Sequence, residues 1–83
     1  MKGSKRLSEL QVGEKATIVA LDESEFGVKL MEMGCVPGCE IKLKYKAPLG
    51  DPACYCVQGY DLSLRLKEAA SIKISSNNED QAQ

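Results

Sequence analysis

The residues of this sequence that could do chemistry are its four cysteines, because it contains no histidine. They come in two pairs, Cys35 with Cys39 and Cys54 with Cys56. Four thiolates can bind zinc or iron in a tetrahedral site, whereas histidine, the commonest general base and metal ligand, is absent here. The chemistry therefore depends on whether the fold brings the two pairs together.

The predicted strands place the second pair in the core. The loop 47–52 joins two predicted strands, and closing it with Lys46 opposite Ala53 puts Cys54 and Cys56 on the apolar face of the hairpin. Free cysteine behaves as a small buried hydrophobic residue. We therefore expect both thiols to pack inside.

A site made of all four thiols is not expected. In this register Cys56 lies opposite Leu43, which is four residues, or about 13 Å at about 3.3 Å per residue, from Cys39 along the strand. Sulfur atoms about 2.3 Å from one ion cannot span that distance. A two-cysteine site made by Cys35 and Cys39 stays open. We expect Co(II) to produce no thiolate charge-transfer band.

An acidic cluster precedes the predicted helix at residues 24–33. Its members are Asp22, Glu23 and Glu25. Carboxylate oxygens are ligands for hard cations, but acidic side chains at the start of a helix also cap it and complement its dipole. We expect the capping role.

Length and composition limit the classes of function. A chain of 83 residues forms one domain at most, expected at residues 1–75, with a disordered polar tail at 76–83. The net charge of −1 argues against nucleic-acid binding, and no apolar run approaches the about 20 residues of a membrane span. The charged N-terminus lacks an apolar segment behind it, which predicts a cytoplasmic protein with reduced thiols. No nucleophile lies at a readable spacing from a base, so we expect no enzyme.

One short helix with a defined end is predicted at residues 24–33. Apolar side chains at i, i+4 and i+7 share one face: Phe26, Leu30 and Met33. Gly34 is expected to end the helix in a left-handed conformation, and the Pro-Gly pair at 37–38 predicts a type II turn. Gly27 costs about 1 kcal/mol relative to alanine, so packing must hold this helix.

The rest of the chain is predicted to be mainly β. Alternating or apolar runs predict strands at 15–21, 40–46, 53–58, 60–65 and 71–75, with helical turns near 7–10 and 67–70. Five short strands at nearly regular spacing predict a small closed barrel.

Two surface features are candidates for partner binding. The strand 40–46 carries apolar residues on one face and three lysines on the other: Lys42, Lys44 and Lys46. The loop that follows it carries the second candidate set: Pro48, Leu49, Gly50 and Asp51. The lysines could bind an acidic partner surface, but the same pattern is typical of a strand face that is exposed to solvent. The loop could be a docking site, but its residues are equally typical of a rigid turn.

Three motifs resemble one known family. Residues 30–38 read Leu-Met-Glu-Met-Gly-Cys-Val-Pro-Gly, and residues 47–52 read Ala-Pro-Leu-Gly-Asp-Pro. Residues 62–65 read Leu-Ser-Leu-Arg, followed by alanine at 69 or 70 and Ile-Lys-Ile at 72–74. In this order and spacing they resemble the FeoA family of ferrous iron transport proteins.

The resemblance implies a five- to six-stranded SH3-like barrel with one inserted α-helix. It also implies a cytoplasmic accessory protein of bacterial Fe(II) uptake whose partner is the FeoB-type GTP-binding transporter. The family offers no catalytic residues to carry over, and no cofactor is expected. The alternative left open is a transition-metal-binding module, an iron chaperone or sensor with weak affinity for Fe(II). The oligomeric state is not set by the sequence.

Overall fold

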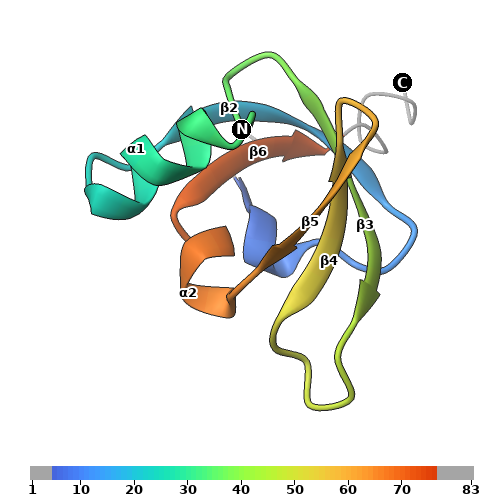
Figure 1. The fold of residues 1–83 in the computed structure, drawn as a ribbon. Coiled ribbons are helices and arrows are strands. Elements are labelled where there is room, and N and C mark those ends of the chain that lie inside the picture. Colours follow the sequence, from blue (N-terminus) through green and yellow to red (C-terminus); the bar gives the residue numbers. More distant parts are fainter. Residues whose placement is uncertain (1–4, 77–83) are drawn as a thin grey trace.

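The computed structural model describes residues 5–76, which form one strongly curved sheet flanked by two short helices (Figure 1). The fold is mainly β, as predicted. The elements in chain order are β1 (Lys5–Arg6), a 3₁₀ helix η1 (Leu7–Glu9), β2 (Lys15–Leu21), α1 (Glu25–Glu32), β3 (Glu40–Lys46), β4 (Ala53–Val57), β5 (Tyr60–Leu64), α2 (Leu66–Ala69) and β6 (Ile72–Ser76).

All the described strands lie in one antiparallel sheet, in the order β1-β6-β2-β3-β4-β5. The prediction of a closed barrel is wrong, because within residues 5–76 β1 and β5 are edges that do not pair with each other. Among the described residues β1 holds Lys5 and Arg6; both pair with β6, and the chain then turns into η1 at Leu7 instead of continuing along the sheet.

The C-terminal bound of the predicted domain, residue 75, falls inside a strand. β6 reaches Ser76, one residue into the predicted tail. Residues 77–83 lie outside the described residues. The predicted helical turn at 7–10 is confirmed as η1, and the turn near 67–70 is confirmed as α2.

The buried core cluster is aliphatic apart from Tyr55 and Cys35. Ala16 and Ile18 of β2 lie in this cluster, and η1 adds Leu7 to it. The largest fully buried side chains are Leu7, Leu10, Ile18, Leu30, Ile41, Leu43, Leu64, Ile72 and Ile74. Burying each of these contributes about 1.5–3 kcal/mol, which is the main favourable contribution to folding.

Helix α1 begins and ends where the sequence indicates. The Ser24 hydroxyl accepts a hydrogen bond from the Gly27 N–H at 3.3 Å, and Gly34 has φ of 103° directly after the helix. Leu30 is fully buried and Phe26 is partly buried. Met33 is 37% exposed, because it follows the last helical turn instead of continuing the buried face.

The predicted type II turn after the helix is also present. The Cys39 N–H donates to the Val36 carbonyl at 3.1 Å, and Gly38 has φ of 94°. This turn sends the chain into β3.

Gly27 has a structural role that its helix propensity hides. It is buried in the first turns of α1, where a Cβ atom would overlap the backbone carbonyl oxygen of Asp22. The absence of a side chain therefore lets α1 pack directly against the end of β2.

We expect Gly27→Ala to lower the free energy of unfolding by about 1–3 kcal/mol, because the added methyl group must displace backbone. Alanine is the better helix former by about 1 kcal/mol, so propensity alone predicts the opposite sign. Urea unfolding measures the difference, with Val28→Ala at the neighbouring exposed position as control. A Gly27→Ala chain as stable as wild type would contradict the close approach.

Candidate functional site

A bulge in the β3–β4 hairpin decides where two of the cysteines lie. Lys46 pairs with Ala53 and Tyr45 with Cys54, as predicted, but the register then shifts so that Leu43 pairs with Tyr55. The extra residue in β3 reverses which β4 side chains point inward.

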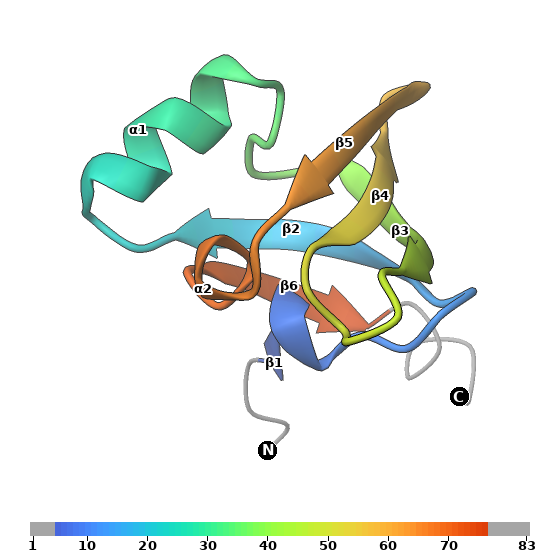
Figure 2. The same ribbon diagram turned by 60° about the horizontal axis from the view of Figure 1, so that its bottom comes forward.

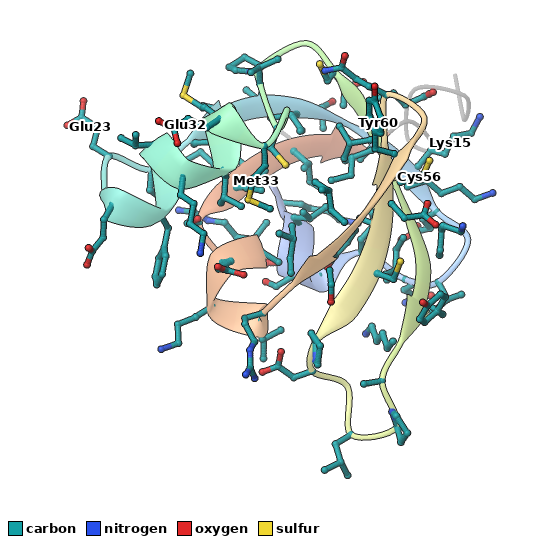
Figure 3. The ribbon with its side chains drawn as sticks, viewed as in Figure 1. Lys15, Glu23, Glu32, Met33, Cys56 and Tyr60 are labelled. Carbon is teal, nitrogen blue, oxygen red and sulfur yellow. The ribbon has the colours of Figure 1, made fainter. Side chains whose placement is uncertain are left out.

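The prediction that Cys54 and Cys56 lie on the inner face of the sheet is therefore wrong. Tyr55 and Val57 fill the inner face of β4, and both cysteines lie on the outer face, with Cys56 opposite Lys42. Cys54 is nevertheless buried, and Cys56 is half-buried. Figure 3 shows Cys56 on the side of the sheet that also carries Lys15.

Cys54 interacts with Tyr45, which the bulge turns outward. Tyr45 is 60% exposed, and a hydrogen bond with the Cys54 thiol raises the pKa of the Tyr45 phenol. Cys54 therefore has a local partner on the outer face of the sheet.

The other pair lies at the corner between α1 and β3. Cys35 is fully buried in the core cluster, and burial, together with the neighbouring Cys39, raises the pKa of its thiol. The Cys39 sulfur accepts a hydrogen bond from Gln58 Nε2 at 3.0 Å, and the same nitrogen donates to the Gly34 carbonyl at 3.2 Å. Gln58 thus connects the β4–β5 turn to this corner, a contact that no local sequence signal predicts.

The described residues offer no set of ligands for a tightly bound metal. Within residues 5–76, no group of three or more cysteine, aspartate or glutamate side chains is placed to hold an ion. Of the acidic cluster, Asp22 pairs with Arg6 at 2.9 Å, and Ser24 caps the helix instead of Asp22. Cys35 and Cys39 alone would give two ligands, one of them a buried thiol whose raised pKa disfavours the thiolate.

The lysine stripe is interrupted by the same bulge. Lys42, Lys44 and Lys46 are all exposed, but Tyr45 continues the outer face after Lys44. Lys44 Nζ pairs with the Asp61 carboxylate of β5 at 3.0 Å, and this hydrogen bond raises the pKa of Lys44. Lys44 therefore belongs to a cross-strand pair, while Lys42 and Lys46 remain exposed.

The predicted docking loop presents one apolar side chain to solvent. Leu49 is 95% exposed, and the Gly50 N–H donates to the Ala47 carbonyl at 2.7 Å behind it. Asp51 Oδ1 accepts a hydrogen bond from the Leu66 N–H at 2.9 Å, so this residue holds the loop against the start of α2. The loop is thus a turn held by hydrogen bonds, and it exposes the Leu49 side chain to solvent.

A groove of about 800 Å³ lies beside this loop. Its lining comes from α1, from the loop and from the segment around α2: Phe26, Asp51, Arg65, Leu66, Lys67 and Glu68. Figure 2 shows α2 directly after the end of β5, with α1 above it in the view. No local sequence pattern predicts this groove, because its walls are distant in the chain.

The acidic side chains of the groove have hydrogen-bond partners, whereas its two cationic side chains form no salt bridge within residues 5–76. Glu68 accepts a hydrogen bond from the Arg65 N–H at 2.8 Å and lies 3.8 Å from Lys29 Nζ, and Asp51 is held by the Leu66 N–H. Within residues 5–76, the side chains of Arg65 and Lys67 have no carboxylate partner. The groove therefore combines apolar walls with two cationic side chains, Arg65 and Lys67, that form no salt bridge within residues 5–76.

The family model of the FeoA domain matches residues 5–76. The chain belongs to the FeoA domain family. A curated relative from Porphyromonas gingivalis, "Fe(2+) transport protein A/Fe(2+) transporter FeoB fusion protein", is 43% identical over 76 residues. That alignment covers 87% of this FeoA-family chain but only 9% of the fusion protein.

Solved FeoA structures have the same fold. A FeoA-like protein from Clostridium acetobutylicum has a TM-score of 0.87 and 37% identity, covering 93% of this chain and 91% of that one. FeoA of Stenotrophomonas maltophilia, solved with zinc, has a TM-score of 0.77 and 26% identity, covering 86% and 89% of the two chains. It is described as a procaryotic SH3 domain protein and as a candidate ferrous iron transport activating factor. The SH3-like fold expected from the sequence is thereby confirmed.

None of the helices within residues 5–76 is long and apolar enough to cross a membrane.

Differences in burial predict the order in which the thiols react. We expect N-ethylmaleimide to modify Cys39 and Cys56 before Cys35 and Cys54 in the folded chain, because the first two are partly exposed. The raised pKa of Cys35 lowers its thiolate fraction further. Peptide mass spectrometry after brief exposure gives the order, with the chain in urea as the control in which all four react alike. Early modification of Cys35 would contradict its place in the core.

Proposed function

We propose that this chain is a non-enzymatic accessory of a FeoB-type Fe(II) transporter, which it contacts on the cytoplasmic side and whose GTP-linked transport it modulates. The observation that carries this proposal is the Porphyromonas gingivalis relative, in which a segment similar to this chain is joined to FeoB in one polypeptide. Fusion keeps two modules at a high effective concentration, which is useful when they act together.

The surface of the chain supports a role in contacts. Leu49 is 95% exposed on a loop that is tied at both ends, and Leu66 is half exposed beside the groove. Exposed apolar side chains held on a rigid frame lose little entropy when a partner covers them. Within the described residues, no group of three ligands could hold a catalytic metal.

A second candidate is a metal-binding module. It is favoured by the zinc in the Stenotrophomonas maltophilia relative and by the adjacent thiols of Cys35 and Cys39. It is disfavoured by the burial of Cys35 and by the hydrogen bond that Cys39 already receives from Gln58. We therefore place transporter contact first.

Removing the exposed leucine of the loop tests the contact role. We expect Leu49→Ala to weaken binding to the FeoB-type transporter in nanodiscs by about tenfold, because an interface would lose about 1.4 kcal/mol of apolar burial. Its melting temperature should stay that of wild type, since the side chain is 95% exposed. Biolayer interferometry measures both affinities.

The matched control is Val12→Ala, an exposed apolar residue between η1 and β2. It should leave the affinity unchanged. Equal binding by wild type and Leu49→Ala would remove the loop from the interface. Absence of binding by wild type would overturn the proposed function.

A further inference from the structure

Strand β5 is an open edge of the sheet. Its neighbour on one side is β4, and within residues 5–76 no strand lies on the other side. The turn between β4 and β5 has two residues, Gln58 with φ of 52° and Gly59 with φ of 85°, which is the type I′ pattern. Such a turn makes Val57 and Tyr60 a hydrogen-bonded pair.

The register then fixes which backbone groups face the open edge. Hydrogen-bonded and non-hydrogen-bonded pairs alternate in an antiparallel ladder, so Tyr60, Leu62 and Leu64 bond to β4. Asp61 and Ser63 therefore direct their N–H and C=O groups away from β4. These two residues lie about 7 Å apart, the repeat at which an added strand would pair with them.

This edge lacks the usual protection against pairing. Natural edges carry proline, lysine or a bulge, whereas β5 reads Tyr-Asp-Leu-Ser-Leu and pairs with β4 without a register shift over its whole length. Its one charged side chain, Asp61, is held by Lys44 on the outer face at 3.0 Å. The edge is thus left available for another strand.

Apolar surface lies next to the edge. Tyr60 is 72% exposed and Leu62 is only partly buried, although both belong to the inward-facing set of β5. Figure 3 shows Met33 at the end of α1 directed toward the space between α1 and β5. At the far end of β5, Leu66 is 52% exposed where the groove begins.

Two cationic side chains beside β5 indicate what kind of segment would bind there. Arg65 and Lys67 follow β5 directly, line the groove and have no carboxylate partner within residues 5–76. The acidic groups of the groove, Asp51 and Glu68, already accept hydrogen bonds from backbone N–H groups. A segment that carries its own carboxylates would complement this surface.

We propose that β5 binds an extended, acidic and partly apolar segment of the transporter as an added strand of the sheet. The segment would pair with the backbone of Asp61 and Ser63, direct its apolar side chains toward the groove and place a carboxylate beside Arg65 or Lys67. The proposal rests on the proposed function, because it names the surface through which the transporter is contacted.

Backbone exchange tests the pairing directly. The isotope-labelled chain is measured by amide hydrogen exchange, alone and with the FeoB-type transporter in nanodiscs. We expect the amides of Asp61 and Ser63 to exchange rapidly in the free chain and at least tenfold more slowly in the complex. The amides of Tyr60, Leu62 and Leu64 are the internal control, since β4 protects them in both states.

A matched pair of variants gives a second readout. Ser63→Pro removes the N–H that faces the edge and keeps the pairing with β4, whereas Ser63→Ala keeps that N–H. We expect the proline variant to bind the transporter at least tenfold more weakly and the alanine variant to bind as wild type. If Ser63→Pro does not fold, as its amide spectrum would reveal, the exchange measurement decides alone.

The outcomes separate the two proposals. Transporter binding that leaves Asp61 and Ser63 unprotected overturns the added strand and leaves the proposed function standing. No transporter binding at all overturns both. Protection of these amides that grows with the concentration of the free chain assigns the edge to a second copy and overturns the transporter segment as its occupant.

Discussion

The pairing of β2 with two distant strands is the constraint on which the rest of the structure depends. β2 pairs with β3 on one side and with β6, the last described strand, on the other, while Ala16 and Ile18 fill the core beneath it. This arrangement joins the two halves of the chain and leaves β1 and β5 as the ends of the sheet. The open edge of β5 and the groove beside α2 follow from that topology.

The helix and its corner could be predicted because their signals are local. Ser24 caps α1, Gly34 ends it and the Pro-Gly pair makes the turn into β3, each within a few residues of the feature it determines. The bulge in β3 had no such signal. The apolar alternation of this strand is compatible with a regular ladder, and only packing between β3 and β4 sets the shift that turns Cys54 and Cys56 outward.

In the candidate site, too, the local features could be predicted from the sequence and the long-range contacts could not. The exposed loop with Leu49 was visible as a cluster of turn residues, but the bond between Asp51 and the start of α2 joins positions 15 residues apart. The contacts of Gln58 with Gly34 and Cys39 span 24 and 19 residues. Likewise, the groove exists only after α1, the loop and α2 have assembled. No pattern within one sequence reports such distant pairs.

Together these features describe a small frame that exposes Leu49 and the edge of β5, buries Cys35 and Cys54, and holds Cys39 through Gln58. The central claim is that the chain acts through protein contacts and does not hold the ion. An anaerobic titration of the isotope-labelled chain with Fe(II), followed by amide NMR, tests this claim most directly. We predict no saturable shifts up to millimolar Fe(II). Localised, saturable shifts at Cys35 and Cys39, or at the acidic residues before α1, would contradict the account and favour an iron chaperone or sensor.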